Sequence, residues 1–190
     1  MKQISFIIIL MSILVFSGCE NHKNNTNNTK KAKNSTVVKQ TKLNNANQIT
    51  LHTVDGNELT LIKNGNNLKI KGVKNKVILL DFFATWCPPC KAEIPHLVNL
   101  QKKYKNKLQI ISILLENNKP DSEIKSFIKY NSINYIITNG PNNYKLSSMM
   151  GEVQNIPFMI LYNKKGDIVT HYLGAIPEEM INSDLKKVIK

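Results

Sequence analysis

The sequence predicts an α/β fold: a central mixed sheet flanked by helices on both faces, with a β-hairpin added at its N-terminal end. Three observations lead to this prediction. Short segments of alternating apolar residues separated by turn residues come first, and a continuous apolar run follows at 77–83. Helical patterns then alternate with strands up to a second hairpin and a last helix.

The first strands follow from simple alternation. Apolar residues alternate over 49–53 and over 59–61, and Asp55-Gly56 supplies turn chemistry between them, so these segments form a hairpin. Residues 68–73 form another short extended segment. The run 77–83 is apolar on both faces except at one position, which is typical of a strand buried in the centre of a sheet.

The second half of the chain alternates between helical and extended patterns. The spacing predicts a helix from the cysteine pair to about residue 104, followed by a strand over 108–115 and a helix over 120–130. A strand over 133–138 and a short helix over 144–150 come next. Two strands over 158–162 and 168–172, joined by the turn 163–167, lead to a helix over 177–189.

The N-terminus carries a targeting pattern. A positive start is followed by an apolar run over 4–16, which is too short to span a bilayer and fits a signal peptide over 1–18. The run ends in Phe16-Ser17-Gly18-Cys19, which resembles the bacterial lipobox except that Phe16 stands where Leu is usual. The resemblance implies that Cys19 is acylated and becomes the new N-terminus. An ordinary secretory signal and an uncleaved anchor are the alternatives.

The segment 19–48 is dominated by Asn, Lys and Thr and has few large apolar residues. It cannot bury enough surface to offset the entropy of ordering, so we expect a flexible tether between the membrane and a folded domain over 49–190.

The formal charge of +13 invites a nucleic-acid interpretation. The lysines are spread along the chain, however, without dense arginine runs or aromatic residues among them, which disfavours nucleic-acid binding. Attraction to anionic lipid headgroups or to an anionic cell envelope explains the charge more simply.

The chemistry is concentrated in Cys87 and Cys90, which follow the buried strand and begin a helix. At a helix N-terminus, unpaired backbone N–H groups and the helix dipole favour a thiolate, and a second cysteine one turn later can resolve a mixed disulfide. A zinc site would need two more ligands, and the four histidines (His22, His52, His96 and His171) are isolated. We therefore expect a redox pair, no metal and no other cofactor.

The segment from Leu80 to Glu93, LDFFATWCPPCKAE, resembles the thioredoxin superfamily and most closely its TlpA/ResA-like branch of exported disulfide reductases. The similarity covers about 49–190, including the N-terminal hairpin of that branch. It implies a thioredoxin-like fold and an enzyme that exchanges disulfides through Cys87 and Cys90.

The resemblance also implies roles for single residues. Asp81 matches the buried carboxylate that relays a proton to or from the resolving cysteine in ordinary thioredoxins, although the ResA-like branch often has Asn there. Glu93 matches an acidic residue that tunes the cysteines. We place Glu93 in the first turn of its helix, where a carboxylate also interacts favourably with the helix dipole, so a purely local role stays open. Pro157 matches the cis-proline of the family, which would set the Ile156 backbone against the cysteines.

Three residues around the cysteines complete the expected docking surface for substrates. Trp86 is expected to lie partly in the core and partly on the surface that meets the substrate. Pro88 and Pro89 restrict the loop and remove backbone N–H groups that would otherwise stabilise a thiolate.

For function, the resemblance implies a lipid-anchored monomer in the cell envelope that reduces disulfides of exported proteins, with apocytochrome c in cytochrome c maturation as one substrate. Such a reductase needs electrons from a transmembrane donor of the DsbD/CcdA type, because the envelope is oxidising. The alternatives are a DsbA-like oxidase or isomerase and, from a different class, a non-catalytic binding or copper-delivery module.

Overall fold

The computed structural model describes residues 47–190. The predictions for the signal peptide, for lipidation at Cys19 and for all but the last two residues of the tether lie outside the described residues. The division of the chain at residues 19 and 49 stays a prediction. Within 47–190, no helix is both long and apolar enough to cross a membrane.

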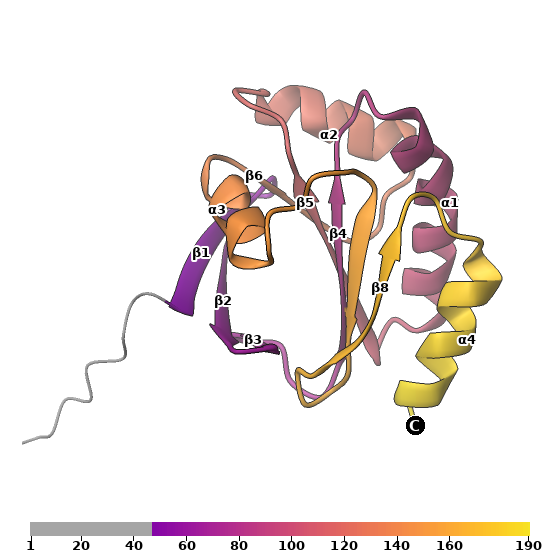
Figure 1. The fold of residues 1–190 in the computed structure, drawn as a ribbon. Coiled ribbons are helices and arrows are strands. Elements are labelled where there is room, and N and C mark those ends of the chain that lie inside the picture. The colour runs from indigo at the N-terminus through magenta and orange to yellow at the C-terminus, as the bar shows by residue number, and fades with distance from the viewer. Residues whose placement is uncertain (1–46) are drawn as a thin grey trace, which may run out of the picture. The chain divides into compact units, whose positions relative to one another are not determined.

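The described chain forms one eight-stranded sheet and four helices (Figure 1). The strands are β1 (Gln48–Thr53), β2 (Glu58–Asn64), β3 (Asn67–Ile70), β4 (Val77–Phe83), β5 (Leu108–Leu114), β6 (Ile136–Asn139), β7 (Phe158–Tyr162) and β8 (Ile168–Leu173). The helices are α1 (Pro88–Lys103), α2 (Asp121–Tyr130), α3 (Asn142–Met149) and α4 (Glu178–Val188). The strand order is β3-β2-β1-β6-β5-β4-β7-β8, and the pairs β4–β5 and β5–β6 are parallel while the others are antiparallel. This is the mixed thioredoxin-like sheet that the sequence predicts.

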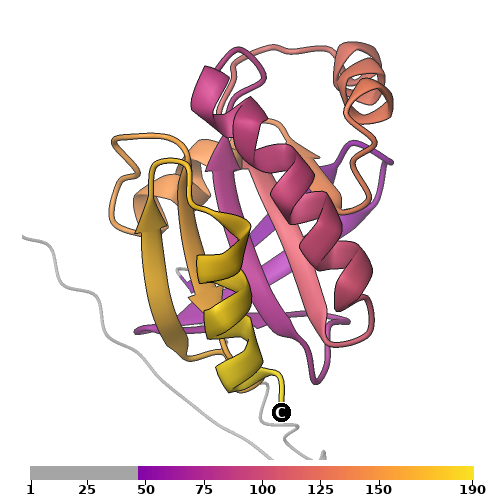
Figure 2. The same cartoon turned by 90° about the vertical axis from the view of Figure 1, so that its right-hand side faces the viewer.

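The strand β4 is buried at all seven positions, and its side chains alternate between two cores. Val77 and Leu79 pack with α1, β5, β7 and α4 on one face. Ile78, Leu80 and Phe82 pack on the other face with the N-terminal strands and α3. Figure 2 shows α1 and α4 next to each other on the first of these faces. The continuous apolar run of β4 is therefore explained, because neither face of this strand reaches water.

Two boundaries differ from the sequence prediction for a local reason. The strand predicted over 133–138 is shorter and begins at Ile136, because residues 131–133 form the turn that ends α2. Ser132 has a φ of 54° there, and the backbone N–H of Ile133 donates to the carbonyl of Ile128 over 3.0 Å. The third strand ends at Ile70, where the Val73 N–H turns back to the Ile70 carbonyl over 3.2 Å.

The sheet curls until its N-terminal strands meet the β7–β8 turn. The backbone N–H of Leu68 donates to the Gly166 carbonyl over 2.8 Å, and Asn67 pairs with Asp167 across the same gap. Gly166 has a φ of +90°, and a Cβ at this position would overlap the carbonyl oxygen of Leu68. This contact requires glycine both for its backbone conformation and for the close approach.

We predict that Gly166→Ala lowers the free energy of unfolding by about 3 kcal/mol, because both the backbone and the Leu68 carbonyl must move. Gly65→Ala is the matched control, since Gly65 also has a positive φ of +57° but nothing lies within 4 Å of the place that a Cβ would occupy there. Its cost should be about 1 kcal/mol. Urea unfolding of both variants measures the difference, and equal losses would contradict the close-approach argument.

Candidate active site

The two cysteines lie at the junction between β4 and the first turn of α1. They form a disulfide, with Cα atoms 5.3 Å apart, and both side chains are buried to within 3% exposure. Cys87 is the N-cap residue of α1, and Pro88 and Pro89 occupy its first two positions. Because neither proline has a backbone N–H, the first available donor is the N–H of Cys90, which lies 3.3 Å from Cys87 Sγ.

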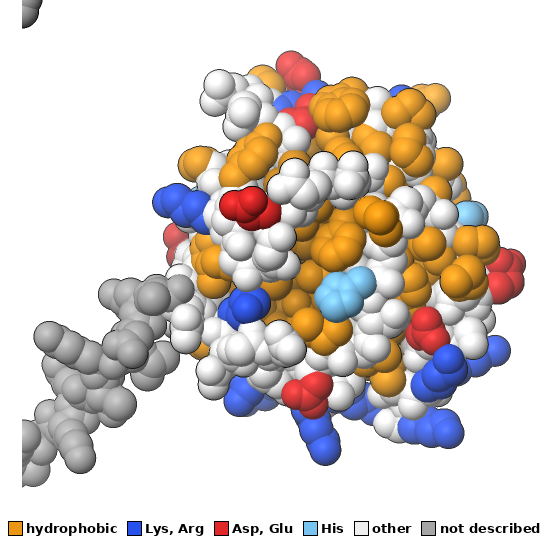
Figure 3. All heavy atoms as spheres, viewed as in Figure 1, with side chains coloured by type: hydrophobic (Ala, Val, Ile, Leu, Met, Phe, Trp, Pro, Cys, Tyr) orange, Lys and Arg blue, Asp and Glu red, His pale blue; other side chains and the backbone are white. Residues whose placement is uncertain are grey.

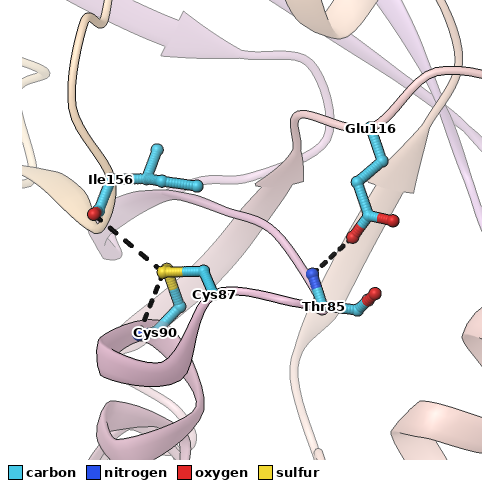
Figure 4. The surroundings of a disulfide bond; sticks show 5 residues. All are labelled: Thr85, Cys87, Cys90, Glu116 and Ile156. Atoms are coloured by element: carbon cyan, nitrogen blue, oxygen red, sulfur yellow. Dashed lines mark hydrogen bonds between the residues drawn. A yellow bond between two sulfur atoms is a disulfide. The ribbon is translucent and has the colours of Figure 1, made fainter.

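The segment before β7 closes the site from the other side. The peptide bond between Ile156 and Pro157 is cis, and the Ile156 carbonyl oxygen lies 4.0 Å from Cys87 Sγ (Figure 4). The Pro157 carbonyl in turn accepts from the N–H of Gly174 over 2.9 Å, which ties this segment to the end of β8. Residues predicted to act together, Cys87, Ile156 and Pro157, are thus brought together by the fold.

Apolar surface surrounds the disulfide. Trp86 is 66% exposed directly before Cys87, and Pro88 and Pro89 are also exposed. A pocket of about 220 Å³ lies beside the cis-proline segment and includes Met150, Val153, Phe158 and Leu173 in its lining. Leu173 is 65% exposed. An extended chain that approaches Cys87 can therefore cover apolar side chains on both sides of the disulfide.

Two buried carboxyl groups come from β4, which precedes the cysteines, and from α1, whose first turn holds them. Asp81 on β4 is 4% exposed and accepts a 2.6 Å hydrogen bond from Ser112 Oγ on β5. Burial raises the pKa of Asp81 to about 6, against the opposing effect of the Ser112 hydrogen bond.

Glu93 is the second of these groups, on α1, and is 1% exposed. Burial raises its pKa to about 8, repulsion from Asp81 adds to this, and the hydrogen bond from the Ile176 N–H opposes it. That bond joins Ile176 N to Glu93 Oε1 over 3.1 Å. The placement of Glu93 in the first helical turn was wrong: α1 begins at Pro88, so Glu93 lies in the second turn. Its position is explained by contact with the β8–α4 loop and not by the helix dipole.

A pocket of about 420 Å³ opens beside Glu93 and is bounded by α1 and the loop before α4. Glu93 Oε2 and His96 Nδ1 are both buried there and have no hydrogen-bond partner among the described residues. No three His, Cys, Asp or Glu side chains within residues 47–190 come together in a way that could hold a metal ion.

Glu116, directly after β5 and Leu115, was not predicted from the sequence. One of its carboxylate oxygens accepts a hydrogen bond from the backbone N–H of Thr85, and the other lies 3.1 Å from Lys119 Nζ (Figure 4 shows the Thr85 contact). Burial by itself would raise the pKa of Glu116, but the hydrogen bonds from Thr85 and the Lys119 ammonium hold it below its usual value. The contact fixes the loop that leads into Cys87.

A dithiol–disulfide pair at a helix N-terminus, opposite a cis-proline in a thioredoxin-like sheet, defines the class of thiol–disulfide oxidoreductases. Comparison with known proteins agrees with this class. A sequence model of the family described as Redoxin matches residues 27–189, and the chain belongs to this family.

Individual relatives carry the same activity in their names. The chain is 30% identical over 125 residues to the thiol-disulfide oxidoreductase ResA of Bacillus thuringiensis, and the aligned residues cover 65% of this chain and 70% of the relative. It is 28% identical over 128 residues to ResA of Bacillus subtilis, where the alignment covers 67% of this chain and 69% of the relative. The protein is therefore a TlpA/ResA-like thiol–disulfide oxidoreductase, and its substrates are proteins that contain disulfides.

Solved structures show the same fold. StoA from Bacillus subtilis superposes with a TM-score of 0.56 at 22% identity, over 72% of this chain and 95% of StoA. A thiol:disulfide interchange protein DsbE from Chlorobium tepidum superposes with a TM-score of 0.61 at 19% identity, over 76% of this chain and 95% of the DsbE chain.

The raised pKa of Glu93 predicts a pH dependence of stability. Its folded pKa lies above its unfolded value, so its favourable contribution is complete below about pH 4.5 and is lost as the pH rises through about 8. Glu93→Gln should flatten this loss and raise the free energy of unfolding at pH 9 by about 1–4 kcal/mol relative to the parent. Urea unfolding of the oxidised protein measures this without a contribution from cysteine ionisation.

Glu58→Gln, which removes an exposed carboxylate at the start of β2, is the matched control and should leave the pH profile unchanged. A Glu93→Gln profile as steep as that of the parent would contradict the assignment.

Loss of the Glu116 contact should loosen the loop before Cys87. We predict that Glu116→Leu lowers the free energy of unfolding by about 1–3 kcal/mol and speeds hydrogen exchange at the Thr85 amide, because that N–H loses its acceptor. Glu123→Gln removes only the longer, exposed contact to Lys119 at 3.7 Å and serves as the control. Equal effects of the two changes on Thr85 exchange would be inconsistent with the contact.

Proposed function

We propose that the protein is a membrane-anchored reductase of disulfides in exported proteins and that Cys87 and Cys90 carry the reaction. The observation that carries this proposal is the position of Cys87: it caps α1, its sulfur accepts from the Cys90 N–H, and the Ile156 carbonyl faces it across 4.0 Å. A substrate chain that lies along the Ile156 segment would have its disulfide beside this sulfur.

The proposed reaction takes two steps. The Cys87 thiolate attacks one sulfur of the substrate disulfide, which forms a mixed disulfide and releases the other substrate sulfur as a thiol after it takes up a proton. The Cys90 thiolate then attacks Cys87 Sγ, so that the second substrate thiol leaves and the Cys87–Cys90 disulfide forms. The substrate gains two electrons and two protons, and the protein loses them.

The buried carboxyl groups are suited to handle the proton of Cys90. Asp81 lies on β4, before the cysteines, and has a pKa of about 6. Glu93 lies on α1, after them, and has a pKa of about 8. Both groups can therefore hold a proton near neutral pH. Removal of a proton from Cys90 would make it the nucleophile of the second step. No further cofactor takes part.

The remaining parts of the proposal concern location and partners. We assign the chain to the cell envelope as a monomer held by acylation of Cys19, with a transmembrane reductase of the DsbD/CcdA type as its donor. Trp86 and the apolar pocket next to Ile156 support binding of unfolded polypeptide segments. Apocytochrome c before haem attachment is one such substrate, since its paired cysteines must be reduced.

The reduction potential of the Cys87–Cys90 pair tests the direction of the reaction. Equilibration of the purified protein against dithiothreitol or glutathione should give a value near that of thioredoxin, about −270 mV. A value near that of DsbA, about −120 mV, would contradict the proposal and indicate an oxidase.

A second measurement tests the role of each cysteine. Cys90→Ser should trap a mixed disulfide with an oxidised substrate peptide, because the second step is lost, whereas Cys87→Ser should form none. Mass spectrometry under non-reducing conditions detects the adduct. An adduct on Cys90 in the Cys87→Ser variant would reverse the assignment, and retained activity without both cysteines would indicate a binding module.

A further inference from the structure

Five lysines line one pocket at the opposite end of β4 from the disulfide. The pocket has a volume of about 310 Å³. Its lysines are Lys69 on β3, Lys74 and Lys76 in the connection to β4, and Lys164 and Lys165 in the β7–β8 turn. We call this cavity, with the five lysines and its other lining residues, the lysine pocket. Since β4 spans about 20 Å between Val77 and the loop before Cys87, the pocket and the active site lie at different ends of the sheet.

The charges of the lysine pocket are only partly balanced by carboxylates, because Asp167 attracts Lys165 from the same turn. The pocket lining contains no Asp or Glu, and the three ion pairs within residues 47–190 involve only Lys119 and Lys187. In that part of the chain, the ammonium groups of Lys69, Lys74 and Lys165 donate no hydrogen bond. Like charges gathered in this way repel one another, so the arrangement favours an anion as partner.

Two further lysines of the pocket reach main-chain oxygens. Lys164 Nζ donates to the main-chain oxygens of Ile189 and Lys190, and Lys76 Nζ lies 3.5 Å from the Lys105 carbonyl. Asp167, in the same turn as Lys164 and Lys165, already accepts hydrogen bonds from Asn67 and Asn163. In Figure 3, blue side chains, with some red ones among them, lie along the lower end of the face shown, below the apolar surface at its centre.

The floor of the pocket is apolar and consists of Leu68, Ile70, Val73 and Ile78. Lysine side chains can lay their methylene groups along such a floor while their ammonium groups reach outward, as they do at a membrane interface. No aromatic residue lines the pocket, so it lacks the stacking platforms that single-stranded nucleic acids use.

The N-terminal segment enters the domain close to this pocket. Gln48, the first residue of β1, pairs with Ile62 of β2, and Ile62 pairs with Lys69 of β3. The three residues form one row across the sheet, so Gln48 and Lys69 are two strand spacings, or about 10 Å, apart. The chain that leads back to Cys19 therefore joins the domain at the same end as the lysine pocket.

We propose that the lysine pocket docks on the anionic phospholipid headgroups of the membrane that holds the chain. This inference rests on the membrane anchoring in the proposed function and adds an orientation to it: in the docked state, Trp86 and the disulfide face away from the bilayer, toward substrates. Release from the headgroups would free the active site to turn toward a donor in the membrane. Docking is electrostatic and weakens as salt screens the lysines.

Lysine footprinting of the full chain tests this orientation. The chain is reconstituted into vesicles of phosphatidylcholine with or without phosphatidylglycerol and treated with a membrane-impermeant amine reagent. We expect Lys69, Lys74 and Lys165 to be labelled about tenfold more slowly on the anionic vesicles, and high salt to remove the protection. The exposed lysines Lys125 and Lys129 on α2 should react equally on both.

Trp86 supplies an independent readout because it is the single tryptophan of the chain and is 66% exposed at the active site. Brominated phosphatidylglycerol should leave its fluorescence unquenched if the disulfide end faces away from the membrane. Quenching of Trp86, or equal protection of the pocket lysines on uncharged vesicles, would overturn the proposal.

Matched variants separate the pocket from the overall charge. The triple change Lys69→Gln, Lys74→Gln and Lys165→Gln should abolish protection of the remaining pocket lysines, Lys76 and Lys164. The triple change Lys125→Gln, Lys129→Gln and Lys145→Gln lowers the net charge equally and should keep that protection. The same loss in both variants would overturn the proposal.

Two further arms identify the anion and separate this inference from the proposed function. Protection by inorganic phosphate without vesicles, at equal ionic strength, would indicate a site for soluble anions and contradict membrane docking. Flotation on uncharged vesicles reports on the anchor alone, and disulfide reduction by the same samples reports on the active site. Either can fail while the comparison of anionic with uncharged vesicles still gives a result for the lysine pocket.

Discussion

The strand β4 sets the position of every part of the active site, because it is buried on both faces between β5 and β7. A strand held in this way cannot shift its register without exposing apolar residues to water. Its end therefore delivers Cys87 to a fixed point, where α1 begins. The same two neighbours bring in the other groups: β5 leads to Glu116 against the loop before Cys87, and the segment before β7 places the Ile156 carbonyl beside the sulfur.

Much of this could be predicted from the sequence, and the reasons are local. The run 77–83 and the spacing of Cys87 and Cys90 are patterns of neighbouring residues, and the structure has the strand and the helix start where these patterns put them. The close contact of Gly166 with Leu68 was not predictable, because it depends on how far the whole sheet curls. Glu93 was misplaced by one helical turn because it was counted from the apolar positions that start at Ile94, whereas Pro88 and Pro89 are the first residues of α1.

Glu116 was not predicted as a site residue for a different reason. It stands close after a strand that runs parallel to β4, and residues after the carboxyl ends of adjacent parallel strands meet at one edge of a sheet. That rule could have drawn attention to Glu116 once β4 and β5 were recognised as neighbours. The sequence by itself does not show that the Thr85 N–H would be its partner, since Thr85 lies in a loop whose path depends on tertiary contacts.

The two buried carboxyl groups connect the fold to the chemistry. Asp81 and Glu93 are held in apolar surroundings by β4 and α1, and repulsion from Asp81 adds to the cost of ionising Glu93, so the pair gives up its protons over a wide pH range. Their burial lowers stability at neutral pH, because an ionised carboxylate in such a place lacks solvation. A chain selected only for stability would have apolar side chains at these positions. Since Glu93 Oε1 accepts the hydrogen bond from the Ile176 N–H, a change in the protonation of Glu93 would act on the loop before α4.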